Sequence, residues 1–318
     1  MKDSMKKAPQ IALGLHSLLV FSCFLFLTSC NHLFYQPSER EFLTPAKINQ
    51  AYQELTIETS DGVELSAWLL PTTEKKFGTL VQFHGNAQNM TTHFLYVHWL
   101  VNFGFDVVVF DYRGYGLSGG FPSRKGLVDD GRAVIDYLAT EQDSGQNGFF
   151  VLGQSLGGAV AVPSIALSGA ERMGKIRGVL LDSTFTSYRD IAQDKLADIW
   201  LTWPLQVPLS YLISDELSLQ DYVHQLSMPV IVIHALEDTV VPYHFGEKIF
   251  QRIPSAQKQF WKVKRGHVSA LASPRSPFRP MLVQFLCRYS RQPKLCLENK
   301  RRVEEEAEEY AYRQILPL

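Results

Sequence analysis

Short apolar runs rich in Val, Leu, Ile and Phe alternate with longer segments of helical length or spacing from residue 53 onward. Strands that are apolar throughout are typical of a parallel sheet buried on both faces, and parallel neighbours need a crossover, usually a helix. The expected strands cover residues 79–83, 107–110, 149–152, 178–181 and 230–234, and the expected helices cover 92–103, 126–140, 156–167 and 243–252. This alternation predicts an α/β fold with a mostly parallel central sheet and helices on both faces.

Two segments depart from the alternation. Residues 55–59 and 63–70 flank Asp61-Gly62, a pair typical of a hairpin turn, so these two strands are expected to be antiparallel. Residues from 183 to about 225 form a long stretch that contains tryptophans and prolines. This stretch predicts an inserted cap, because functional lids commonly occupy long insertions, and a surface excursion packed only on itself is the alternative.

The composition is that of a globular protein. The chain has 318 residues, of which 46% are hydrophobic and 20% charged, so it is long enough to bury a sizeable core. A net charge of -1 gives no electrostatic basis for binding nucleic acid, and no DNA or RNA partner is expected. No spacing of His, Cys or carboxylate residues is typical of a metal site, so neither a metal nor another cofactor is expected.

Cys287 and Cys296 are the cysteines that bear on the folded domain. Outside the cytoplasm they can form a disulfide that closes a short loop, whereas in a reducing compartment they stay as two free thiols. The sequence leaves both possibilities open, because it does not give the geometry that a bridge requires. It leaves the oligomeric state open as well.

The N-terminal residues have the layout of a secretory signal peptide. Lys2, Lys6 and Lys7 precede an apolar run over residues 11–27, which ends in small polar residues. The run is shorter than the ~20 residues that cross a bilayer comfortably, and polar side chains interrupt it. This pattern favours cleavage over a permanent anchor helix.

Leu27-Thr28-Ser29-Cys30 resembles a bacterial lipobox. The resemblance implies cleavage before Cys30 and acylation of its sulfur, so that lipid chains tether the mature protein to a bacterial membrane. Each methylene group of a chain that is buried in the bilayer contributes ~0.8 kcal/mol to the free energy of membrane binding. Asn31 stands where an aspartate is associated with inner-membrane retention, which implies an outer-membrane location facing the periplasm in a Gram-negative source. An ordinary signal peptide or an uncleaved anchor with an incidental cysteine is the alternative.

Gly153-Gln154-Ser155-Leu156-Gly157 has the form G-x-S-x-G and directly follows the expected strand over residues 149–152. A serine hydroxyl is a poor nucleophile at neutral pH, so acyl transfer needs it exposed, beside a base and facing donors for the oxyanion. A tight turn between a buried strand and a helix provides that exposure, and the glycines remove side chains that would crowd it. The position in the fold therefore predicts Ser155 as a nucleophile.

Asp238 and His267 follow later strands, in the chain order that this type of serine turn requires. Asp238 comes just after the strand over 230–234, and His267 just after a strand-like run over 259–263. His267 is expected to take the proton of Ser155 and return it to the leaving group. Asp238 is expected to fix the tautomer of His267 and to support the imidazolium.

Asp182 and Glu237 are competing acids. Asp182 ends the preceding strand and is more simply a turn or helix-capping residue, whereas Glu237 adjoins Asp238. His234 lies within a strand and is expected to be a core residue with its hydrogen bonds satisfied.

An oxyanion hole needs two amide donors. Leu156, directly after the nucleophile, is expected to supply one N–H, and Asn86 in His84-Gly85-Asn86-Ala87 is expected to supply the other. His84 is expected to organise this turn and not to transfer protons.

With these residues placed, the chain resembles the α/β-hydrolase superfamily over residues 53–289. The string F-D-Y-R-G-Y-G-L-S-G over residues 110–119, together with H-G-N-A over 84–87, resembles the branch of serine-aminopeptidase-like and bud-emergence-related hydrolases. That string is expected to be a structured loop without a catalytic function. The implied organisation is a signal peptide over 1–29, a linker over 30–52, an α/β-hydrolase domain over 53–290 with the cap at about 183–225, and a charged tail over 291–318.

The function expected from these residues is that of a serine hydrolase. It would cleave carboxylic esters or lipid-derived acyl groups through an acyl-enzyme, with the membrane as a partner through Cys30. The branch that it resembles is catalytically heterogeneous, so the fold does not name the substrate. A serine peptidase or amidase is the alternative, and a non-catalytic binding lipoprotein of the same fold is a third reading.

Overall fold

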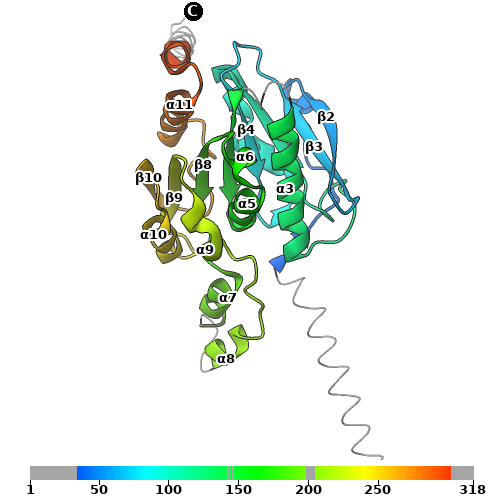
Figure 1. Cartoon of the computed structure of the whole chain (residues 1–318), viewed down its shortest axis with the longest axis vertical. Coiled ribbons are helices and arrows are strands. Elements are labelled where there is room, and N and C mark those ends of the chain that lie inside the picture. The colour runs from blue at the N-terminus through cyan, green and yellow to red at the C-terminus, as the bar shows by residue number, and fades with distance from the viewer. Residues whose placement is uncertain (1–33, 142–143, 145–146, 198–204, 302–318) are drawn as a thin grey trace, which may run out of the picture. The chain divides into compact units, whose positions relative to one another are not determined.

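The computed structural model describes residues 34–141, 144, 147–197 and 205–301. The chain divides into two compact units, residues 1–36 and 37–318. Within the described residues, the second unit contains an eight-stranded sheet with helices on both faces (Figure 1). The predicted signal peptide and Cys30 lie outside the described residues, as does the tail beyond residue 301.

The strand order in the sheet is β10-β9-β8-β7-β4-β6-β3-β2. The bounds are β2 (Gln53–Glu58), β3 (Glu64–Leu70), β4 (Gly78–Phe83), β6 (Phe105–Phe110), β7 (Phe149–Gln154), β8 (Ile176–Asp182), β9 (Val230–Glu237) and β10 (Lys258–Arg265). Two-residue strands, β1 (Gln36–Pro37) and β5 (Ala87–Gln88), lie outside this sheet. All neighbours from β10 to β6 are parallel, and β3 is antiparallel to both β6 and β2. The predicted fold class and the predicted hairpin around Asp61-Gly62 are therefore confirmed.

The main helices begin and end close to the predicted residues. The α-helices are α2 (Met90–His93), α3 (Arg124–Thr140), α5 (Leu156–Leu167), α6 (Ala170–Met173), α7 (Tyr188–Ala197), α8 (Gln206–Ser210), α9 (Leu219–Tyr222), α10 (Tyr243–Arg252) and α11 (Phe278–Tyr289). The 3-10 turns are η1 (Pro45–Ile48), η2 (Phe94–Tyr96), η3 (His98–Phe103) and η5 (Val223–Gln225). Residues 293–301 are also helical.

The single helix predicted over 92–103 is wrong. The segment forms three short pieces, α2, η2 and η3, in which Val97 N donates to Phe94 O at 3.0 Å and Leu100 N donates to Val97 O at 3.0 Å. These i to i+3 bonds are those of a 3-10 turn, which is tighter than an α-helix. Phe94, Val97 and Leu100 are fully buried, so packing against the sheet decides the local conformation here.

Each face of the sheet has its own layer of helices, as Figure 1 shows. Phe150, Leu180 and Ile231 point to one face, where they share a core with Phe285 of α11. On the other face α3 and α5 pack together, and α10 lies against β9. Both faces are covered, which is why the central strands are apolar throughout.

The segment between β8 and β9 forms α7, α8 and α9, and Figure 1 shows α7 and α8 beyond the carboxyl end of β8. This helical excursion occupies the region predicted to be a cap, and its role as a cap stays a prediction.

Residues 37–52, which belong to the region predicted to be a linker, contact the folded domain. Ser38 O accepts a hydrogen bond from Asn89 Nδ2 at 2.7 Å, and Phe42 N donates to Thr91 Oγ1 at 3.0 Å. Ile48 packs against the apolar core. The folded domain therefore begins well before residue 53.

Cys287 of α11 and Cys296 form a disulfide, so the structure resolves the alternative that the sequence leaves open. The bridge joins the last helix over the sheet to the helical residues 293–301. Within the described part of the chain, every helix is too short or too polar to cross a bilayer.

Candidate active site

Ser155 lies on a strained turn between β7 and α5. Its backbone has φ 53° and ψ -119°, a conformation that costs a non-glycine residue about 1–3 kcal/mol and persists only where the surroundings impose it. The main chain is held from the side, because Ser155 N donates to Asp182 O at 2.8 Å. The Ser155 hydroxyl does not cap α5, so it stays available above the carboxyl end of the sheet.

The glycines around Ser155 are required by close packing. A Cβ on Gly157 would lie 2.0 Å from the backbone oxygen of Phe83, and one on Gly158 would lie 2.6 Å from the side chain of Thr184. Only hydrogen fits at both positions, so α5 can begin directly against the ends of β4 and β8. The predicted strand, tight turn and helix are thus present, with the bounds that the motif requires.

Asp238 and His267 form a hydrogen-bonded pair. His267 Nδ1 lies 2.9 Å from Asp238 Oδ2, and the Asp238 side chain is fully buried whereas that of His267 is 22% exposed. Asp238 Oδ1 accepts two backbone hydrogen bonds, from Val240 N at 2.8 Å and Val241 N at 2.9 Å. The carboxylate is therefore fixed by its own turn and presents its second oxygen to the histidine.

The charge state of Asp238 follows from these bonds. Burial alone raises the pKa of Asp238, but the hydrogen bond from His267 and the two backbone donors outweigh burial and hold the pKa below its usual value. Asp238 is ionised at neutral pH and can stabilise a positive charge on His267. His234, fully buried in β9, has its Nε2 2.8 Å from Val241 O and so fastens the same turn.

The competing acids have other partners. Glu237 points to the surface and pairs with Arg265 at 2.8 Å. Asp182 is not a turn or capping residue, because its side chain is fully buried and accepts hydrogen bonds from Ser183 Oγ at 3.1 Å and Gln154 Nε2 at 3.5 Å. Burial raises the pKa of Asp182 to about 6. Asp238 is thus the carboxylate that His267 contacts.

The loops that carry Ser155 and His267 are joined by a short chain of contacts. Asp182 binds the backbone of Ser155, and Ser183 next to it accepts a hydrogen bond from Val268 N at 3.2 Å through its hydroxyl. Val268 directly follows His267 and has a positive φ of 52°, so the loop turns sharply at this point. The structure therefore holds the serine and histidine loops at the same edge of the sheet.

The turn His84-Gly85-Asn86 lies against Ser155. The point where a Cβ of Gly85 would stand is 3.6 Å from Ser155 Cβ and 3.7 Å from Gln154 O. Leu156 is the first residue of α5, and the first N–H groups of a helix have no acceptor within the helix. The two segments predicted to form an oxyanion hole are thus next to the serine, and the Leu156 N–H lies at a helix end that favours negative charge.

Among the described residues, no three His, Cys, Asp or Glu side chains are grouped in a way that could hold a metal ion.

This arrangement defines a class of protein. A mostly parallel sheet with a serine on a strained turn after β7, and with an acid and a histidine after β9 and β10, is the architecture of the α/β-hydrolases.

Comparison with known proteins agrees with that class. Residues 74–222 match the family described as serine aminopeptidase, S33. The uncharacterized protein YfhR of Salmonella typhimurium is 30% identical over 284 residues, covering 85% of this chain and 92% of that protein. Protein bem46 of Schizosaccharomyces pombe is 30% identical over 236 residues, 71% of this chain and 74% of that protein. The chain belongs to the α/β-hydrolase superfamily.

A solved structure shows the same fold. The esterase Pf2001 of Pyrococcus furiosus matches with a TM-score of 0.64 at 22% identity, over 80% of this chain and 97% of that one.

Sequence reasoning missed some of the polar residues around the site. Asp111, Tyr112 and Tyr115 contact the His84-Gly85-Asn86 turn, and Gln154 reaches Asp182 beneath the serine. A signal was present, because Asp111 directly follows a buried strand, and strand ends of parallel sheets collect functional side chains.

Proposed function

We propose that this protein is a serine hydrolase that cleaves carboxylic esters through an acyl-enzyme intermediate. The observation that carries the proposal is the 2.9 Å contact between His267 and Asp238 at the sheet edge where Ser155 stands on its strained turn. Nucleophile, base and orienting acid come from three loops at one edge, in the order that the fold requires.

In the proposed reaction, Ser155 Oγ attacks the carbonyl carbon of the ester while His267 Nε2 takes the hydroxyl proton. The N–H groups of Asn86 and Leu156 bind the oxyanion of the tetrahedral intermediate. His267 then donates its proton to the leaving alcohol, which breaks the ester bond and leaves an acyl group on Ser155. Water, deprotonated by His267, repeats the sequence and releases the acid. Asp238, already ionised, stabilises the imidazolium at both stages.

The hydrogen bond between Ser155 and His267 is part of this proposal. Catalytic hydrogen bonds of hydrolases often become short only in the complex with substrate.

Two kinds of substrate have support. The fold of the esterase Pf2001 favours an ester. The family description, serine aminopeptidase, favours the alternative of a peptidase or amidase, which needs protonation of a poorer leaving group. We place the ester first, because no pocket for an amine or a side chain is evident in the sequence, and we propose that the region 183–225 caps the acyl site.

Labelling with a fluorophosphonate tests the nucleophile. The folded protein should be modified on Ser155, and Ser155→Ala should abolish the label. Ser168→Ala, at the other end of α5, is a matched control that should keep it. An unmodified Ser155 in folded protein would exclude both hydrolase readings and leave the binding lipoprotein.

A substrate panel then separates the two hydrolase readings. With chromogenic esters of increasing acyl length, kcat should fall by at least about 10³-fold in Ser155→Ala. If aminoacyl anilides have a higher kcat/KM than every ester, the peptidase reading replaces the esterase.

We also propose a lipid anchor on Cys30, supported by the lipobox-like segment that precedes it. The anchor would hold the domain at a bacterial membrane, in keeping with lipid-derived acyl substrates. Radioactive palmitate should label the protein in cells, and Cys30→Ala should remove the label. Retention of the label in Cys30→Ala would exclude this anchor.

A further inference from the structure

The oxyanion turn His84-Gly85-Asn86 is held by the segment that follows β6. Tyr112 hydroxyl donates to the backbone oxygen of His84 at 3.0 Å, and Tyr115 hydroxyl donates to Asn86 Oδ1 at 3.0 Å. Both tyrosines are fully buried, so the bond from Tyr112 is shielded from bulk water, whereas the bond from Tyr115 ends on the partly exposed Asn86. Two hydroxyl groups from one segment thus form hydrogen bonds with the first and last residues of the turn.

Asp111, the residue directly after β6, contacts the same turn. His84 Nδ1 donates to Gly85 O at 2.7 Å, and His84 Nε2 lies 3.3 Å from Asp111 Oδ1, with both side chains at 1% exposure or less. Asp111 Oδ1 also accepts from Met90 N at 2.7 Å, where the chain leaves the turn and enters α2. The carboxylate therefore binds the start of the helix and lies next to the ring of His84.

Ring contacts complete the enclosure of His84. Its ring centroid lies 4.5 Å from that of Tyr112 and 5.4 Å from that of Tyr115, and it stacks on His93 at 5.1 Å. A side chain packed on three sides keeps one rotamer, and the backbone of Gly85 follows it through the Nδ1 hydrogen bond.

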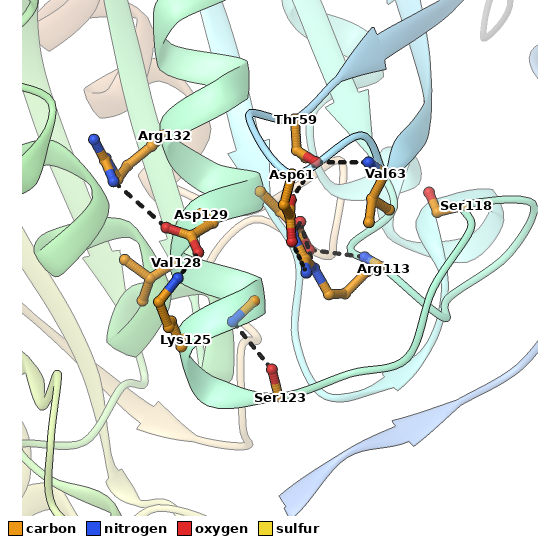
Figure 2. Close-up of polar contacts among 12 residues, drawn as sticks. Thr59, Asp61, Val63, Arg113, Ser118, Ser123, Lys125, Val128, Asp129 and Arg132 are labelled. Carbon is orange, nitrogen blue, oxygen red and sulfur yellow. Dashed lines mark hydrogen bonds and ion pairs between the residues drawn. The ribbon is translucent and has the colours of Figure 1, made fainter.

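The segment 111–116, which contacts the turn, is itself bound to two elements that are distant in the sequence. Figure 2 shows Arg113 beside Asp61 of the β2–β3 turn, where its guanidinium nitrogens lie 2.8 and 3.0 Å from the two carboxylate oxygens. Arg113 Nε also donates to Asp130 of α3 at 2.8 Å, and the backbone N–H of Arg113 donates to the same carboxylate at 2.8 Å. Such forked pairs restrict direction as well as distance.

Gly116 is needed for the close approach of Asp111. A Cβ at Gly116 would stand 1.9 Å from Asp111 Oδ2, and its φ of +53° is one that side chains rarely adopt. Five of the six residues in the D-Y-R-G-Y-G string therefore either contact the turn, hold the segment in place or leave room for Asp111.

We propose that Asp111, Tyr112 and Tyr115 are positioning residues that hold the His84-Gly85-Asn86 turn so that the Asn86 N–H points at the developing oxyanion. This inference rests on the proposed hydrolase function of Ser155. An oxyanion donor is effective only within about 2.7–3.1 Å of the charge that develops, and its removal costs about 10²–10³ in kcat. The turn lies beyond the end of β4 and outside the sheet ladder, so it needs other contacts to reach that precision.

Tyr112→Phe and Tyr115→Phe test the role, because each removes one hydroxyl and keeps the ring. On the best chromogenic ester, each variant should lower kcat roughly tenfold or more, with KM within about twofold of wild type. Affinity for an alkyl boronic acid, whose adduct with Ser155 places an oxygen in the oxyanion hole, should fall by a similar factor. Tyr137→Phe on α3 is the matched control, since its hydroxyl bonds no residue of the turn, and it should match wild type.

Amide hydrogen exchange gives a readout that does not depend on activity. In both variants, peptides covering residues 84–88 should exchange at least about tenfold faster than in wild type, whereas peptides from α3 should not change. Unchanged exchange at 84–88, or a kcat loss without weaker boronate binding, would overturn the positioning role. Failure of the hydrolase proposal would give a different result, because wild-type Ser155 would not be labelled by fluorophosphonate. Hydrogen exchange would still decide whether the two tyrosines fix the turn.

Discussion

Two adjacent carboxylates at the end of β9 have opposite surroundings, and this difference leads to a test. Asp238→Asn keeps the shape of the buried acid but removes its charge and disturbs the tautomer of His267. We expect kcat to fall by about 10⁴ with little change in KM. Glu237→Gln, a surface residue paired with Arg265, should change kcat less than about twofold. Steady-state kinetics of both variants decide between them, and equal losses would mean that the acid is misassigned.

Asp182 gives a prediction on the pH dependence of stability. Burial raises the pKa of Asp182 from 3.8 to about 6, so between these values the folded protein holds a proton that the unfolded chain releases. The contribution of Asp182 to the free energy of unfolding is therefore fully present below pH 4 and is lost as the pH rises through about 6. The loss is at most about 3 kcal/mol at neutral pH.

Urea unfolding of Asp182→Asn against wild type isolates this effect. The amide keeps an acceptor for Ser183 Oγ and has no charge to bury, so the variant should gain in relative stability from pH 4 to pH 7. A difference in unfolding free energy that stays constant over this range would contradict the raised pKa.

At the scale of single residues, the sequence predicts those whose proposed role follows from their place after a strand. Ser155, Asp238 and His267 each follow a recognisable apolar run, and Glu237 could be set aside only once its partner was seen. Asp182 was misread, because nothing in a strand-end aspartate tells whether its carboxylate turns outward as a cap or inward to Gln154. Side-chain direction at strand ends depends on tertiary contacts.

At the scale of elements, the serine turn depends on how closely α5 approaches β4, and Gly157 sets that distance. A Cβ on Gly157 would stand 2.0 Å from a backbone oxygen, which cannot move without shifting β4. Gly157→Ala should therefore destabilise the protein by about 3 kcal/mol or more, and it should remove Ser155 labelling.

Gly174→Ala is the control for this glycine. Gly174 has φ -65° and its nearest atoms would be 3.4 Å from the new Cβ, so alanine fits and the stability should be unchanged or slightly higher. The free energy of unfolding in urea, with soluble yield, measures both variants. Equal stability of the two would contradict the packing argument.

Elements were predictable where one face or both faces are dictated by burial. The central strands and α3, α5 and α10 follow from apolar runs and spacing. Residues 92–103 have the same apolar spacing, yet form the end of α2 followed by two 3-10 turns, because packing of Phe94 and Leu100 against the sheet outweighs local preference. The place of Asp111 after a buried strand was visible in the sequence, but the partners of the 110–119 string were not, since its hydrogen bonds go to β4–α2 and to α3, far away in sequence.

At the scale of the whole molecule, the disulfide closes the C-terminal end of the domain. Cys287 belongs to α11, which covers the sheet, and both cysteines are fully buried in the same apolar core. The two cysteines are 9 positions apart in the sequence, and closing a loop of this length stabilises the folded state by about 2–3 kcal/mol. A structural bridge of this kind is typical of proteins outside the cytoplasm, in keeping with the signal-peptide layout at the N-terminus.

Reduction should therefore lower the melting temperature of the wild-type protein by about 5–10 °C. The variant carrying both Cys287→Ala and Cys296→Ala should melt at least as low, because it lacks the bridge and also loses buried sulfur contacts. Reductant should not shift the melting temperature of that variant, which separates the bridge from other thiols in the chain. Differential scanning calorimetry with and without reductant measures all four states. A wild-type melting temperature that is insensitive to reductant, with both thiols shown free by alkylation under native conditions, would contradict a stabilising disulfide.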